Sequence, residues 1–83
     1  MKIENWERQD LGNKKVVWTH IGGVKIFLTP VGPGFYQLIL YDRSGAEHFR
    51  SEPNYNRTSL EQMSVRWQRD YNKHMKQKDK IST

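Results

Sequence analysis

The sequence has no cysteine and no apolar run long enough to cross a bilayer. Without cysteine there are no disulfides or thiolate metal sites, so 83 residues must rely on a modest hydrophobic core. The first ten residues, MKIENWERQD, also lack the apolar stretch of a signal peptide. We therefore expect one intracellular domain over residues 1–83, cytoplasmic or associated with a nucleoid or nucleus, with no membrane partner.

Sequence patterns typical of enzymes and metal sites are also absent. His20, His48 and His74 do not have the spacing of metal ligands, and no carboxylates form an evident acid–base pair. The stretches GGVK and GPGF do not precede a helix, so neither predicts a phosphate-binding loop. We expect no metal, no cofactor and no catalytic activity.

Positive charge is present in excess and is unevenly distributed. The net charge is +5, from 14 basic and 9 acidic residues. Residues 57–83 hold seven basic and three acidic residues, whereas residues 1–56 hold seven and six. An excess confined to one segment favours a polyanionic partner such as nucleic acid, although a net charge of this size also serves solubility alone.

Four stretches rich in β-branched and aromatic residues predict strands within residues 15–51: KVVWTHI, VKIFLTP, FYQLILYDR and AEHFRS. Short turns join them, including Gly22-Gly23, so they predict an antiparallel meander. Residues 1–14 are expected to form an irregular lead-in, with Trp6 folded back onto the core.

A helix is predicted over residues 58–78. Thr58 and Glu61 form a T-x-x-E capping box at its start, and residues 79–83 are expected to fray. Its apolar residues recur three and four apart and predict one buried stripe, beside which His74 should pack: Leu60, Met63, Trp67, Tyr71 and Met75. The predicted fold class is α+β (ββββα), an antiparallel sheet of three to four strands covered on one face by a single C-terminal helix.

The opposite side of this helix carries cations. They are spaced three and four apart and face away from the apolar stripe: Arg66, Arg69, Lys73, Lys76 and Lys80. Exposed helix faces usually mix charge signs, because like charges four apart repel. The pattern predicts contact with an anion, most simply nucleic-acid phosphate, or else reflects ordinary surface charge.

The face of the sheet away from the helix combines aromatic rings, cations and amides. Alternation along the strands assigns nine residues to it: Lys25, Phe27, Thr29, Gln37, Ile39, Tyr41, Arg43, His48 and Arg50. Such a surface suits nucleic acid or a protein partner, with Phe27, Tyr41 and Arg43 as the main partner-binding residues. Alternatively, the N-terminal segment covers part of this face through Trp6.

The stretch FYQLILYDRSGAEHFRSEPNYNRTSLEQMSVRWQRDY, residues 35–71, resembles the core of plant ethylene-response-factor and integrase arm-type DNA-binding domains. Those domains join two strands by a Gly-containing turn and continue into a Thr-started helix rich in aromatic and Arg residues. In that family the sheet enters the major groove. The resemblance implies DNA contact by six residues: Lys25, Gln37, Tyr41, Arg43, His48 and Arg50.

The sequence thus favours a small basic nucleic-acid-binding module that acts through the helix cations and the outer sheet face. The alternative is a small phage- or virus-type protein that inhibits a host protein or nucleoprotein complex by binding an acidic surface. Added salt distinguishes the two, because phosphate binding collapses with salt and an aromatic interface persists. DNA or RNA as the ligand and the oligomeric state are left open.

Overall fold

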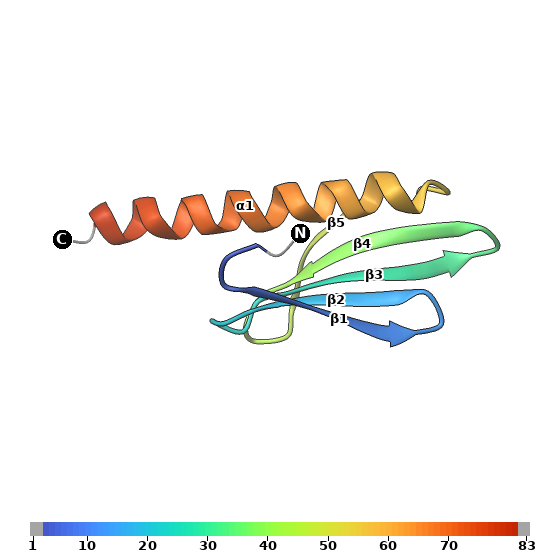
Figure 1. Cartoon of the computed structure of the whole chain (residues 1–83), viewed down its shortest axis with the longest axis horizontal. Helices are drawn as coiled ribbons and strands as arrows, with labels where there is room; N and C mark the ends of the chain where they lie inside the picture. The colour runs from blue at the N-terminus through green and yellow to red at the C-terminus, as the bar shows by residue number, and fades with distance from the viewer. Residues whose placement is uncertain (1–2, 82–83) are drawn as a thin grey trace.

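The computed structural model describes residues 3–81, with side chains for residues 3–75. Five strands precede one helix: β1 (Trp6–Gly12), β2 (Lys15–His20), β3 (Lys25–Gly32), β4 (Phe35–Tyr41), β5 (Glu47–Arg50) and α1 (Arg57–Ile81). The strands form one antiparallel sheet in the order β1-β2-β3-β4-β5. The α1 helix lies across one face of this sheet, over β4 and β3 (Figure 1). The α+β prediction of an antiparallel sheet with a C-terminal helix is confirmed.

The predicted number of strands is wrong by at least one, because residues 1–14 are not an irregular lead-in. Residues Trp6–Gly12 form β1, which pairs with β2 from Trp6 opposite His20 to Gly12 opposite Lys15. The sequence WERQDLG is rich in charged and polar residues because β1 is an edge strand whose side chains after Trp6 are exposed. Its strand conformation comes from pairing with β2, and charged residues on an edge also discourage unwanted strand addition.

The turn between β1 and β2 has the expected backbone chemistry. Asn13 and Lys14 both have positive φ, at 52° and 64°, as the two central residues of a type I′ hairpin turn require. Between β2 and β3, only the second glycine takes positive φ, since Gly23 lies at 101°. Both turns bring consecutive strands together and so fix the meander.

The hydrophobic core lies between α1 and the sheet. Alternate residues of β2, β3 and β4 point toward the helix and are buried with Trp6 and Leu60: Val16, Trp18, Ile26, Leu28 and Leu38. Ile26 pairs across the strands with Trp18 on one side and Leu40 on the other, so the core side chains form continuous cross-strand rows.

The buried side of α1 is rotated relative to the predicted stripe. Its most buried residues are Leu60, Ser64 and Gln68, which lie four apart in one row. Trp67 and Tyr71 flank this row and pack on the core, whereas Met63 is exposed. His74 is exposed as well, so its predicted packing is wrong. The small Ser64 side chain leaves room for the helix to lie close to the sheet.

The helix begins one residue before Thr58, and its cap is Asn56. Asn56 Oδ1 accepts a hydrogen bond from the Ser59 amide at 3.2 Å, and its carbonyl accepts from the Leu60 amide at 3.4 Å. The predicted Thr58–Glu61 capping box is therefore wrong. Asparagine caps at least as well as threonine, and the earlier start adds helical hydrogen bonds. The backbone is helical through Ile81, beyond the predicted end at residue 78; residues 82 and 83 lie outside the described residues.

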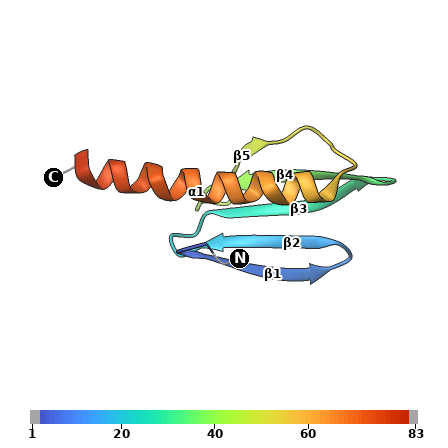
Figure 2. The same cartoon turned by 45° about the horizontal axis from the view of Figure 1, so that its top comes forward.

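The segment before β1 attaches to α1. The Trp6 indole Nε1 donates to Asn72 Oδ1 at 3.0 Å, and Asn72 Nδ2 donates to the Glu4 carbonyl at 2.8 Å. The Trp6 ring packs edge-on against His20 and Tyr71, with centroid separations of 5.0 and 5.7 Å. Trp6 thus packs into the core on the helix-covered face, as predicted, and the alternative that it covers the outer face is wrong. Beyond these contacts α1 continues past the end of the sheet (Figures 1 and 2).

Candidate nucleic-acid interface

The outer face of the sheet, away from α1, is hollowed. The hollow has a volume of about 600 Å³. Its lining combines apolar groups, cations and turn residues: Leu11, Lys15, Gly23, Lys25, Phe27, Thr29, Ile39, Tyr41, Asp42, Arg43, Ser44 and Gly45. Six of the nine residues assigned to this face by alternation therefore meet at one concave surface.

Two aromatic rings in the lining of the hollow contact each other. Phe27 on β3 and Tyr41 on β4 make an edge-to-face contact with centroids 5.4 Å apart and an interplanar angle of 90°. Both side chains are half-buried, and Phe27 lies directly opposite Ile39 in the sheet. Because each ring fixes its neighbour, the pair offers a preorganised apolar surface to a flat ligand.

Three exposed cations surround the rings: Lys15 on β2, Lys25 on β3 and Arg43 after β4. The lining holds one carboxylate, that of Asp42. Its Oδ1 accepts from the backbone amides of Ser44 and Ala46 at 2.9 and 3.1 Å. These contacts and the Ser44 hydroxyl lower the pKa of Asp42, so the carboxylate stays ionised and holds the turn. The lining residues thus carry three positive charges and one negative charge.

The turn that carries Arg43 lies against the β2–β3 loop. A Cβ added at Gly23 would come within 3.2 Å of Arg43 Cβ, and the φ of +101° disfavours any other residue there. Gly23 therefore allows the loop to approach Arg43 closely. Arg43, which follows β4, and Lys25, at the start of β3, thus line the same hollow.

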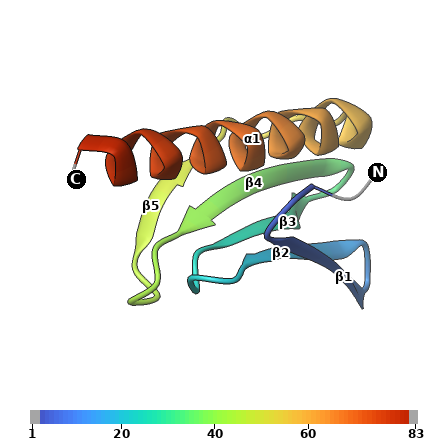
Figure 3. The same cartoon turned by 60° about the vertical axis from the view of Figure 1, so that its left-hand side comes forward.

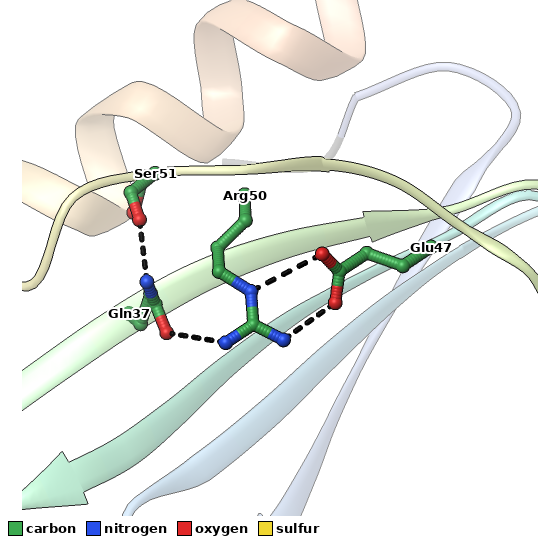
Figure 4. Close-up of polar contacts among 4 residues, drawn as sticks. All are labelled: Gln37, Glu47, Arg50 and Ser51. Atoms are coloured by element: carbon green, nitrogen blue, oxygen red, sulfur yellow. Dashed lines mark hydrogen bonds and ion pairs between the residues drawn. The ribbon is translucent and has the colours of Figure 1, made fainter.

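Two predicted binding residues, Gln37 and Arg50, take part in a polar network within the sheet (Figure 4). Gln37 is buried, and its Nε2 donates to the Ser51 carbonyl at 2.7 Å. Arg50 donates to Gln37 Oε1 at 3.3 Å and to both carboxylate oxygens of Glu47. The hydrogen bond from Arg50 lowers the pKa of Glu47, and the same contact raises the pKa of Arg50. This network joins β4 to β5 and to Ser51, so its polar groups are already occupied.

The remaining sheet candidates divide between the hollow and its surroundings. His48 is exposed on β5 and does not line the hollow. Leu11 lines it but was missed, because β1 was not predicted. Lys15 begins a predicted strand, but alternation was applied only to the two strands that follow, so Lys15 was not assigned to this face. A strand extended backward from the turn before Lys15 would have included Leu11.

The helix cations lie on the other side of the molecule. Arg66, Arg69 and Lys73 are exposed on α1, while the side chains of Lys76 and Lys80 lie outside the described ones. The helix covers one face of the sheet (Figure 1), and the hollow lies on the other face, so the sheet separates the two basic surfaces. A single rigid duplex cannot contact both surfaces at once.

Comparison with known proteins adds no functional assignment: no family model, no curated protein and no solved structure matches this chain. The resemblance of residues 35–71 to ethylene-response-factor and integrase arm-type domains stays a prediction. Within residues 3–81, no helix combines the length and the apolar character needed to cross a membrane.

Proposed function

We propose that this protein is a binding module for single-stranded nucleic acid and that the strand lies across the hollow. The observation that carries the proposal is the pair of half-buried rings, Phe27 and Tyr41, surrounded by Lys15, Lys25 and Arg43. Proteins that bind single strands combine aromatic stacking surfaces with cations that follow the phosphates, and each stacked base contributes about 1–3 kcal/mol.

The form of the hollow favours a single strand over a duplex. In a duplex the base faces are stacked on one another, so the rings in the lining of the hollow would gain no stacking partner. An unpaired base can place its face against Phe27 or Tyr41, while Lys25 and Arg43, which also line the hollow, contact adjacent phosphates. The side chain of Asp42 lines the hollow too, and an exocyclic amine or a hydroxyl group of the ligand can donate to it.

Fluorescence anisotropy with a labelled oligothymidylate, the matching RNA and a duplex tests the proposal. We expect the single strands to bind more tightly than the duplex. With three phosphate contacts, the logarithm of the binding constant should fall with the logarithm of salt concentration with a slope of about −2. Lys25→Gln with Arg43→Gln should flatten this slope by about 1.4, since two contacts are removed.

A matched control comes from the opposite surface. Arg66→Gln with Lys73→Gln removes the same number of charges from α1 and should leave the affinity and slope close to those of the parent. Phe27→Leu keeps apolar bulk but removes the ring, and it should weaken binding about tenfold at every salt concentration. If the two double variants lose the same amount of affinity and Phe27→Leu loses none, binding follows net charge and does not involve the hollow.

A further inference from the structure

A second surface of the molecule is unaccounted for by nucleic-acid binding. Three large apolar side chains gather where α1 passes β5, and we call them the apolar ridge: Phe49, Met63 and Trp67. Phe49 is 55% exposed and Met63 is 37% exposed. Phe49 packs edge-on against Trp67 with centroids 5.2 Å apart, and Met63 precedes Trp67 by one helical turn.

The ridge is continuous with the core but remains open to solvent. Trp67 packs on the buried core cluster on one side and meets Phe49 on the other. Phe49 lies on a four-residue strand whose side chains are all exposed. Its ring is therefore not part of the buried core that stabilises the fold. Contiguous exposed apolar groups of this kind mark interaction sites more often than stray single residues do.

Cations border the ridge along the helix. Arg66 and Lys73 are exposed, and within residues 3–75 neither side chain forms a hydrogen bond or an ion pair. On a helical projection they lie about 60–120° around α1 from Met63 and Trp67, so the basic row runs beside the ridge. Asp70, also exposed, lies between the two rows. The surface is therefore apolar along one side and predominantly basic along the other.

We propose that α1 and β5 form a docking surface for an acidic amphipathic helix of a partner protein. The apolar face of that helix would cover Phe49, Met63 and Trp67, and its acidic flank would meet Arg66 and Lys73. Trp, Met and Arg are enriched where protein interfaces are strongest. Nucleic acid fits this surface less well, because phosphates would contact the cations and leave the apolar ridge uncovered.

The geometry favours a helix over an added strand. The ridge follows the axis of α1 with a one-turn repeat, which matches anchors three to four residues apart on a partner helix. The neighbouring edge, β5, is only four residues long and supplies few backbone groups to an extra strand. Figure 3 shows β5 running up to α1, so the docking surface joins the two elements on the side away from β1. The surface is distinct from the hollow, and the inference does not depend on the proposed function.

Two designed helical peptides of about 18 residues test the inference. Both carry leucines three and four apart along one face; one has glutamates along the flank and the other has lysines there. We expect the labelled acidic peptide to bind the full chain and the basic peptide not to bind. Phe49→Ala should weaken binding about tenfold, as loss of an apolar anchor does, with a smaller loss for Met63→Ala. Phe49 and Met63 are exposed, so both variants should fold.

Charge variants separate this surface from the hollow. Arg66→Gln with Lys73→Gln should weaken the acidic peptide several-fold, whereas Lys25→Gln with Arg43→Gln should not change its affinity. Equal binding of both peptides, unchanged affinity in Phe49→Ala, or no binding of the acidic peptide at several hundred micromolar (~10⁻⁴ M, the weak end of specific recognition) overturns the inference. So does competition by an oligonucleotide at the ridge, or a concentration-dependent dimer that Phe49→Ala abolishes, since a nucleic acid or a second copy would then occupy it.

Discussion

The two faces of the sheet are built from the same strands but differ in their surroundings, since one is covered by α1 and the other is open. On the covered face, Ile26, Leu28 and Leu38 are fully buried beneath α1. On the open face, their immediate neighbours Phe27 and Ile39 line a hollow together with cations. Because successive residues of a strand point to opposite sides, stability and binding can be assigned to alternate residues of one short segment.

The largest expected effect is on the free energy of unfolding, when the same substitution, isoleucine to alanine, is made on each face of the sheet. Ile26→Ala opens an enclosed cavity under the helix and should cost about 2–5 kcal/mol of unfolding free energy. Ile39 is buried too, at 6% exposed, but it borders the hollow, where water or neighbouring side chains can fill the space, so Ile39→Ala should cost less, about 1–2 kcal/mol. Urea denaturation measures both. Equal losses would show that the open face of the sheet stabilises the fold as much as the helix-covered face does.

Ser51 provides a test of the polar network that joins β4 to β5 and to the chain after β5. Its Oγ accepts from the Leu38 amide at 2.9 Å, and its backbone pairs with Gln37 and Leu38 as well. Ser51→Ala leaves a buried amide without an acceptor and should cost about 1–3 kcal/mol. Ser44→Ala, in an exposed turn, should change stability by less than about 0.5 kcal/mol. A Ser51→Ala variant as stable as Ser44→Ala would mean that the network contributes little.

The layer between α1 and the sheet also contains a residue that is expected to lower the free energy of unfolding. Gln68 is 2% exposed, and its Nε2 finds no hydrogen-bond partner. Gln68→Leu removes an unsatisfied buried donor at similar volume and should raise the unfolding free energy by up to about 1 kcal/mol. Gln62→Leu on the exposed side of α1 is the control and should have almost no effect. A loss of more than about 1 kcal/mol in Gln68→Leu would show that the amide is satisfied.

The smallest expected effect is a pH dependence from the covered face. His20 is buried beside Trp6 and Tyr71, and burial lowers its pKa from the ordinary value of 6.5. Its Nδ1 accepts from the Gly22 amide at 2.9 Å, as a neutral ring does. The unfolded chain therefore binds a proton at a higher pH than the folded chain. Stability should be complete above about pH 6.5 and decline as the pH falls through the pKa of the folded state.

Denaturation with urea at several pH values below and above neutrality measures this decline. His20→Phe should remove it, whereas His48→Gln, at an exposed position of β5, should retain it. A decline of unchanged size in His20→Phe would assign the pH dependence to other groups.

The sequence predicted the covered face of the sheet well, because strict alternation in residues 24–40 separates the core side chains from the outer ones. It missed β1, whose charged residues have low strand propensity and become ordered through pairing with β2. It placed Met63 in the core in preference to Ser64 and Gln68, because hydrophobic periodicity cannot recognise a small or polar residue buried for close packing.

For the candidate site, alternation placed several residues on the correct face of the sheet, and their binding role stays a prediction. Lys25, Phe27, Tyr41 and Arg43 reach one hollow as expected. Gln37 and Arg50 were assigned to the right face, but their hydrogen-bond partners arise from the pairing of β4 with β5 and from the chain after β5. Such contacts depend on the three-dimensional register, which residue types in a single strand do not specify.

The most direct test of the central claim is amide and side-chain NMR of the full chain titrated with an oligothymidylate. We expect the signals of Lys25, Phe27, Tyr41 and Arg43 to move together and to saturate at one strand per protein. Signals of Arg66 and Lys73 on the opposite surface should stay in place. Movement confined to Arg66, Lys73 and their neighbours on α1, with the signals of Phe27 and Tyr41 unchanged, would contradict the assignment of the nucleic-acid site to the open face of the sheet.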